Sequence, residues 1–206
     1  MVMITPMCAQ TSIVPENAKP PKKKNQIPYY EFLLEFENNL REHGFAKQIT
    51  LWNLIPPTGP KSQAAYLNGG DYAQVVRHLV GIWVNYQDKL VMIRMHGNIL
   101  TEGQVVPFDQ IAEVRVKIDS REETKTQGRA RPFPPGPPGF RSKTNTGEKT
   151  VSQEIVTGAE VTIVTKSANG VQNYRIYISG TSPQAVPLIQ DIADEIDFIV
   201  NEYKEE

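Results

Sequence analysis

The chain has 206 residues, of which 39% are hydrophobic, and 22 Lys and Arg residues against 23 Asp and Glu give a formal net charge of −1. This length suits one domain with a substantial core, and the near-neutral charge excludes a general attraction of the whole molecule to nucleic acid or membrane surfaces. No stretch reaches the roughly 20 apolar residues of a membrane helix, so an integral membrane protein is not expected.

Residues 1–26 follow neither a helix nor a strand period and contain the cluster Lys22-Lys23-Lys24, which predicts a flexible N-terminal arm. Residues 27–206 are expected to form a single domain. The one cysteine, Cys8, excludes a disulfide or a thiolate metal site within one chain. Its isolation fits a cytoplasmic protein, either free or as part of a larger assembly.

The first helix is predicted from Ile27 or Pro28 to just before Gly44, because proline suits a first helical turn and glycine suits a left-handed cap. The apolar face of this helix carries Tyr29, Phe32, Leu33, Phe36 and Leu40. The apolar run of residues 51–55 follows, and a turn or loop is expected in the proline-rich segment 56–60.

Residues 71–86 divide at Gly81 into a helix, with Asp71 as its candidate cap, and a strand over residues 82–86. Residues 87–89 predict a hairpin turn into a strand over residues 90–95. A further strand is expected through Val105 and Val106. The regular alternation of apolar and basic residues over 114–118 predicts another strand with one buried face.

Strands resume over residues 160–166, and Asn169-Gly170 predicts a hairpin turn into a strand around Tyr174. The chain closes with a helix that begins near Pro183 or Pro187 and ends near Tyr203. A single apolar stripe marks this helix, formed by Ala185, Ile189, Ile192, Ile196, Ile199 and Tyr203.

The segment from about residue 120 to 150 is much longer than usual connections between strands, and we expect a functional insertion there. Its centre, residues 131–141, reads RPFPPGPPGFR, which favours a stiff, exposed, polyproline-like loop. Residues 121–149 contain seven Lys and Arg and three Asp and Glu, a net charge of +4. The candidate partner-binding residues are Arg129, Arg131, Phe133, Pro134, Pro135, Pro137, Pro138, Phe140, Arg141 and Lys143.

No catalytic or metal-binding pattern is present. The histidines His43, His78 and His96 lack ligand or triad spacing, the acidic residues near the C-terminus belong to a helix face, and there is no phosphate-binding glycine motif. The sequence therefore predicts a protein that is not an enzyme and that needs no cofactor or metal.

Residues 105–116, VVPFDQIAEVRV, resemble the strand–corner–strand segment of bacterial pleckstrin-homology-like domains, with hairpins on both sides and an amphipathic closing helix. The resemblance covers roughly residues 80–203 and implies a non-enzymatic binding platform, without any shared ligand residues. The N-terminal helix with its arm and the long insertion depart from that family's pattern.

The expected fold is therefore α+β: an antiparallel, partly closed sheet or barrel with an N-terminal helix and a C-terminal packing helix. The expected function is that of a protein-interaction or assembly subunit, which binds a protein partner or forms a homo-oligomer. The arm and the proline-rich loop are the expected contact elements. Two alternatives stay open. One is a binder of anionic lipid or nucleic acid through the basic loop, and the other is a structural subunit of a viral head or tail.

Overall fold

The computed structural model describes residues 13–14, 18–50, 72–95, 100–127, 149–179 and 185–202. In chain order the elements are η1 (Lys24–Gln26), α1 (Ile27–Glu42), β1 (Lys47–Thr50), α3 (Tyr72–His78), β2 (Gly81–Asn85), β3 (Leu90–Arg94), β4 (Gln104–Pro107), η3 (Phe108–Gln110), β5 (Ile111–Gln127), β6 (Lys149–Ser167), β7 (Gly170–Ser179) and α4 (Ala185–Glu202).

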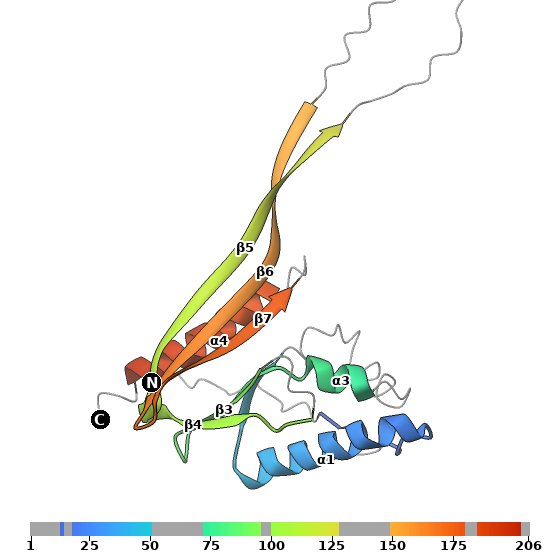
Figure 1. Cartoon of the computed structure of the whole chain (residues 1–206), viewed down its shortest axis with the longest axis vertical. Coiled ribbons are helices and arrows are strands. Elements are labelled where there is room, and N and C mark those ends of the chain that lie inside the picture. The colour runs from blue at the N-terminus through green and yellow to red at the C-terminus, as the bar shows by residue number, and fades with distance from the viewer. Residues whose placement is uncertain are drawn as a thin grey trace, which may run out of the picture.

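The strands form two antiparallel sheets, one of order β1-β2-β3-β4 and one of order β5-β6-β7. The short η3 turn joins the first sheet to the second (Figure 1). The expected α+β class, with a helix near each end of the described chain, is confirmed. The two sheets do not close on each other, so they do not form a barrel.

The two central strands of the first sheet, β2 and β3, are covered on both faces, which explains why every residue of β2 is buried. One face carries Trp83 and Met92 and packs against the apolar sides of α1 and α3. The other face carries Ile82 and Val91 and belongs to the larger core. Strands that are covered on both sides lose the simple alternation of apolar and polar residues, as the continuous apolar run of β2 and β3 shows.

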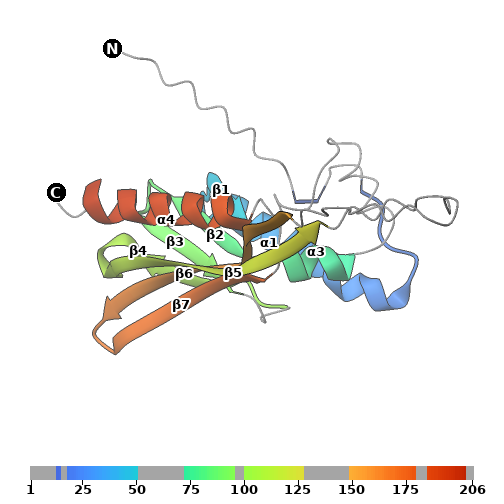
Figure 2. The same ribbon diagram turned by 90° about the horizontal axis from the view of Figure 1, so that it is seen from above.

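The larger core lies between the first sheet, the second sheet and α4. It combines Val84 and Phe108 with Val161 and Ile176 of the second sheet and with the apolar stripe of α4. Figure 2 shows α4 running along one face of the β5–β7 sheet. Pro187 lies in the first turn of α4, where backbone N–H groups have no partner within the helix, so this helix begins before its proline.

The helix α1 ends as its sequence predicts. Gly44 has a φ of 67°, the left-handed conformation that glycine adopts without steric cost. Gly81 is needed for a different reason: a Cβ at this position would lie 2.1 Å from the carbonyl oxygen of Ile49 in β1. The close approach of β1 to β2 therefore depends on glycine.

Part of the segment predicted as an arm contacts the domain. Ile13 and Val14 are buried, and the Val14 amide donates a hydrogen bond of 2.9 Å to Glu37 Oε2. Tyr72 Oη donates a hydrogen bond of 3.0 Å to the carbonyl oxygen of Lys19. Residues 1–12 and 15–17 lie outside the described residues, as do the apolar run of residues 51–55, the turn at 56–60 and the candidate cap Asp71.

One sequence prediction on strand boundaries is wrong, and one strand was not predicted. The strand β5 continues to Gln127 and β6 begins at Lys149, so the long connection is shorter than the expected 120–150. The strand β1 is a further element that the sequence did not reveal. Its four residues show no alternation, because two half-buried residues are followed by two buried ones.

Candidate interaction site

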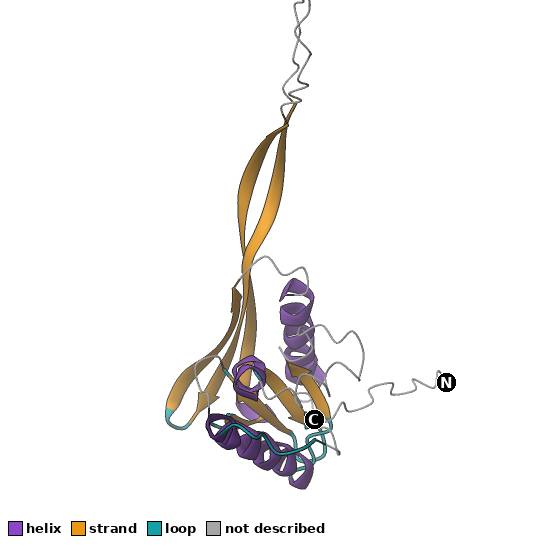
Figure 3. Cartoon of the chain, turned by 90° about the vertical axis from the view of Figure 1, so that its right-hand side faces the viewer, coloured by secondary structure: helices purple, strands orange, loops and turns teal. Residues whose placement is uncertain are grey.

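The second sheet extends into a two-stranded ribbon. The strand β7 ends at Ser179, which pairs with Gly158 of β6, whereas β5 and β6 remain paired as far as Gln127 and Lys149. Residues 120–127 and 149–156 therefore have each other as strand partners and lie beyond the end of β7. Figures 1 and 3 show this ribbon twisting and projecting away from the helices and from the first sheet.

A β-bulge marks the point where the ribbon begins. Asp119 pairs with Gly158 and Ser120 pairs with Val156, which leaves Thr157 as an extra residue on β6. The Thr157 hydroxyl donates a hydrogen bond of 3.2 Å to the carbonyl oxygen of Asp119. Because bulges bend a strand and increase its twist, this residue redirects the ribbon where the support of β7 ends.

The ribbon makes few apolar contacts. Residues 120–122 and 152–154 are exposed, and Ile155 and Val156 are only partly buried. Polar contacts across the strands include a hydrogen bond of 2.5 Å from Ser120 Oγ to Glu154 Oε1. An isolated two-stranded ribbon is marginally stable in water, and at these residues the ribbon lacks the apolar burial of the three-stranded part of the sheet.

The predicted partner-binding residues, from Arg129 to Lys143, lie outside the described residues. The structure shows the two residues, Gln127 and Lys149, between which this segment lies in the chain. Gln127 pairs with Lys149 at the far end of the ribbon, and the basic, proline-rich segment 128–148 joins these two residues.

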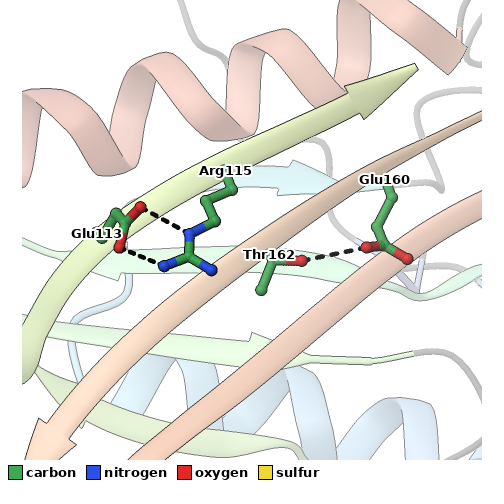
Figure 4. Close-up of polar contacts among 4 residues, drawn as sticks. All are labelled: Glu113, Arg115, Glu160 and Thr162. Atoms are coloured by element: carbon green, nitrogen blue, oxygen red, sulfur yellow. Dashed lines mark hydrogen bonds and ion pairs between the residues drawn. The ribbon is translucent and has the colours of Figure 1, made fainter.

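Charged side chains line the outer face of the second sheet, on the side away from α4. Arg115 donates hydrogen bonds of 2.6 Å and 2.8 Å to the two carboxylate oxygens of Glu113 (Figure 4). These hydrogen bonds lower the pKa of Glu113. Lys117 forms an ion pair of 2.9 Å with Asp119, and this hydrogen bond raises the pKa of Lys117.

The next strand continues this polar face. Thr162 Oγ1 donates a hydrogen bond of 3.2 Å to Glu160 Oε1, and Glu160 lies opposite Lys117 in the register of β5 and β6. The outer face of the sheet thus carries charged and polar side chains of both signs on β5 and β6.

The inner face differs from the expectation. The alternation over residues 114–118 correctly predicts a strand, but Val116 and Ile118 are 39% and 47% exposed. Their partners on β6, Val161 and Ala159, are fully buried. The difference arises because β5 is the outermost strand of its sheet, a position that periodicity does not reveal.

Other candidate sites offer less. A groove of about 500 Å³ runs along α1 and is lined by Leu34, two asparagines and the acidic residues Glu31, Glu35, Glu42 and Glu102. Two of the lining residues are joined by a hydrogen bond of 2.9 Å, which Asn39 Nδ2 donates to Glu102 Oε2.

The two described histidines lie at the ends of different helices. His43 lies at the C-terminal end of α1, where its ring contacts the carbonyl oxygen of Asn39 at 3.0 Å, and His78 ends α3. His96 lies outside the described residues. Within the described ranges, no three His, Cys, Asp or Glu side chains are arranged to hold a metal ion. None of the described helices has the length and apolar character needed to cross a lipid bilayer.

Comparison of the chain with protein-family models, with curated proteins and with solved structures gives no match.

Proposed function

We propose that this chain is a non-enzymatic interaction or assembly subunit that presents its basic, proline-rich segment to a protein partner from the end of the β5–β6 ribbon. The observation that carries the proposal is the length of β5 and β6, which continue beyond the last residue of β7. The two residues that the segment joins, Gln127 and Lys149, therefore lie beyond the three-stranded part of the sheet.

The composition of segment 128–148 suits binding to a protein. A polyproline-like segment is already extended, so it loses little conformational entropy when it docks into an aromatic groove. Phe133 and Phe140 flank the prolines and would serve as apolar anchors, while Arg131 and Arg141 keep the segment soluble.

The part of the domain from which the ribbon projects supports the proposal of a binding platform. The antiparallel hairpins of the two sheets and the C-terminal helix packed on them agree with the element order on which the resemblance to pleckstrin-homology-like domains rests. We propose that the domain body is related to pleckstrin-homology-like domains. We also propose that the protein is located in the cytoplasm or in a larger assembly.

Two further functions each have one observation in their favour. The net charge of +4 over residues 121–149 favours binding to anionic lipid or nucleic acid. The projecting ribbon itself favours a structural subunit of a viral head or tail, in which such an extension would clasp a neighbouring copy.

Binding experiments separate the protein partner from the anionic surface. The full chain is compared with a variant in which Pro134, Pro135, Pro137 and Pro138 are replaced by serine, which preserves length and charge. The probes are purified proline-recognition domains of the SH3, WW and EVH1 classes and vesicles containing phosphatidylserine.

Binding to at least one domain, loss of this binding in the serine variant, and little change between about 50 and 200 mM salt would support the proposal. Binding to vesicles that the serine variant retains and that falls steeply with salt would instead favour the anionic surface. The absence of domain binding by the full chain would count against a proline-directed function.

A further inference from the structure

We infer that two copies of this chain pair edge to edge along β5, in antiparallel orientation, around a two-fold axis that passes beside Lys117. The inference goes beyond the proposed function, because it concerns the base of the ribbon and does not depend on what segment 128–148 binds.

The first argument is the unpaired edge. One side of β5 is hydrogen-bonded to β6, and its other side has no strand partner among the described residues, over the whole length from Ile111 to Gln127. In Figure 1 β5 lies to the left of β6 up to the point where the two strands cross, and no helix lies along that left-hand side above the base of the sheet. A long exposed strand edge is a template for pairing with another chain.

The second argument is the apolar pair beside this edge. Val116 and Ile118 are 39% and 47% exposed on the same face on which Val161 and Ala159 are fully buried. A strand added to β5 would cover these two side chains and would continue the apolar face of the sheet. A second β5 carries the matching residues.

The third argument is the register. A two-fold axis perpendicular to the sheet keeps each face on the same side, and with Lys117 opposite its own copy, Val116 faces Ile118 of the partner. Arg115 then faces Asp119, and the symmetry repeats each of these pairs. Directly opposed residues of opposite charge, and apolar pairs, stabilise antiparallel strands.

The same register also brings Glu113 opposite Arg121. Each of the two opposite-charge pairs occurs twice, which makes four favourable charge pairs. The one unfavourable pair is Lys117 with itself, and its side chain is 71% exposed, so solvent and salt screen the repulsion.

Neighbouring registers are worse. Moving the axis to Val116 opposes Glu113 to Asp119 and Arg115 to Lys117, so that like charges meet throughout. Moving the axis to Ile118 retains one favourable pair, Lys117 with Asp119, and opposes Arg115 to Arg121. The sequence of charges on the outer face therefore selects the register centred on Lys117.

This arrangement has a structural consequence. The two sheets become one antiparallel sheet of twice the width, with both α4 helices on the same face. The two ribbons leave the dimer in opposite directions, so the paired ends Gln127 and Lys149 of the two copies lie at opposite ends of the dimer.

The main test is a charge exchange in the full chain, with self-association measured by analytical ultracentrifugation over a concentration series. Arg115→Asp and Asp119→Arg each place like charges opposite each other twice, so each is expected to weaken dimerisation about tenfold or more. The double variant restores the opposite charges and should recover the dissociation constant to within about threefold. Arg175→Asp, on the exposed side of β7 at the opposite edge of the sheet, makes the same charge change away from β5 and is expected to have no effect.

A second test reads the register directly. In a Cys8→Ser background, Lys117→Cys places two thiols opposite each other, at a Cα separation of about 4.5–5.5 Å that a disulfide or a short bis-maleimide can span. Glu113→Cys is the matched control. Its two copies would lie eight residues apart along the strands, about 26 Å, and should not be joined.

The inference is overturned if the full chain is monomeric over the whole concentration series. It is equally overturned if a dimer forms but both cysteine variants crosslink alike, or if the double charge exchange fails to rescue association. The variant with serine in place of the four prolines should dimerise normally, so failure of the proposed function and failure of this inference are distinguishable.

Discussion

Glu195 of α4 forms an ion pair with Lys47 of β1, and this contact joins the C-terminal helix to the edge of the first sheet. The Glu195 carboxylate is buried, with 6% of its side chain exposed, whereas Lys47 is 41% exposed. Tyr86 also donates a hydrogen bond to Glu195. The carboxylate is thus surrounded by two donors from the sheet, in a position where an apolar residue would otherwise continue the stripe of α4.

We predict that Lys47→Met destabilises the domain by roughly 1–2 kcal/mol, because it removes one hydrogen-bond donor from the buried Glu195 carboxylate. The loss is not larger, because solvent around the partly exposed Lys47 weakens the ion pair. Glu195→Gln should cost less, since an amide oxygen still accepts the Tyr86 hydrogen bond. Urea unfolding of the two single variants and the double variant measures the coupling. Strict additivity of the two effects would show that the ion pair contributes nothing.

A second prediction concerns Arg94, which is 1% exposed at the end of β3. Its Nε donates a hydrogen bond of 2.8 Å to the carbonyl oxygen of Thr101, and its guanidinium donates to the carbonyl oxygens of Val76, at 3.0 Å, and Leu79. The guanidinium also lies 5.2 Å from the centre of the Phe32 ring. Burial lowers the pKa of Arg94 to about 10, which leaves the side chain charged at neutral pH.

Replacing Arg94 by methionine is expected to cost about 2–4 kcal/mol, because it leaves buried carbonyl oxygens at the end of α3 without a donor. Lysine should recover only part of this loss, since an ammonium lacks the planar fork that reaches separate acceptors. Arg77→Met, at an exposed position in the same helix, is the control. A similar unfolding midpoint for all three variants would contradict this account.

Local patterns predicted much of this fold. The apolar stripes of α1 and α4 and the alternation in β7 arise from residues close together in the chain. The glycine cap at Gly44 and the hairpin turn around Asn169-Gly170 mark where elements end. These features are visible without knowledge of the tertiary structure, because helix and strand periods are local properties.

The ribbon could not be predicted in the same way. Residues 120–127 and 149–156 are mostly polar on both faces, so they carry no period-two signal, and their pairing joins segments far apart in the sequence. The exposure of Val116 has a related cause: whether a strand is central or outermost depends on the whole sheet. The proposed binding residues in segment 128–148 remain a prediction from sequence alone.

Gly158 and Tyr177 provide a third prediction, at the base of the ribbon. A Cβ at position 158 would lie 2.5 Å from Tyr177 Oη, so Gly158→Ala forces the tyrosine ring to move. Because Tyr177 is 41% exposed, the ring can swing outward, and we expect a loss of only about 1 kcal/mol.

In a Tyr177→Ser background, Gly158→Ala should stabilise the domain instead of destabilising it. Without the ring, alanine at position 158 restricts the unfolded chain and should stabilise the domain by about 0.4–1 kcal/mol relative to glycine. Chemical unfolding of the four proteins of this cycle tests the prediction. An equal cost of Gly158→Ala in both backgrounds would mean that Tyr177 is not what requires glycine there.

The last prediction concerns the dynamics of the ribbon. Amide protons of residues 120–127 and 149–156 should exchange with solvent much faster than those of residues 159–166 in the three-stranded part of the same β6 strand. The physical reason is that the ribbon has two strands, few apolar contacts and no helix packed on it, so it opens locally at low free-energy cost. Hydrogen exchange followed by mass spectrometry, at protein concentrations below and above that at which the chain associates, measures this difference.

Protection of β5 should rise on the edge that pairs between copies, chiefly over residues 112–122, while protection near Gln127 changes little. Uniform protection along the whole of β6 at low concentration would show instead that the ribbon is stable by itself and needs no partner to cover it.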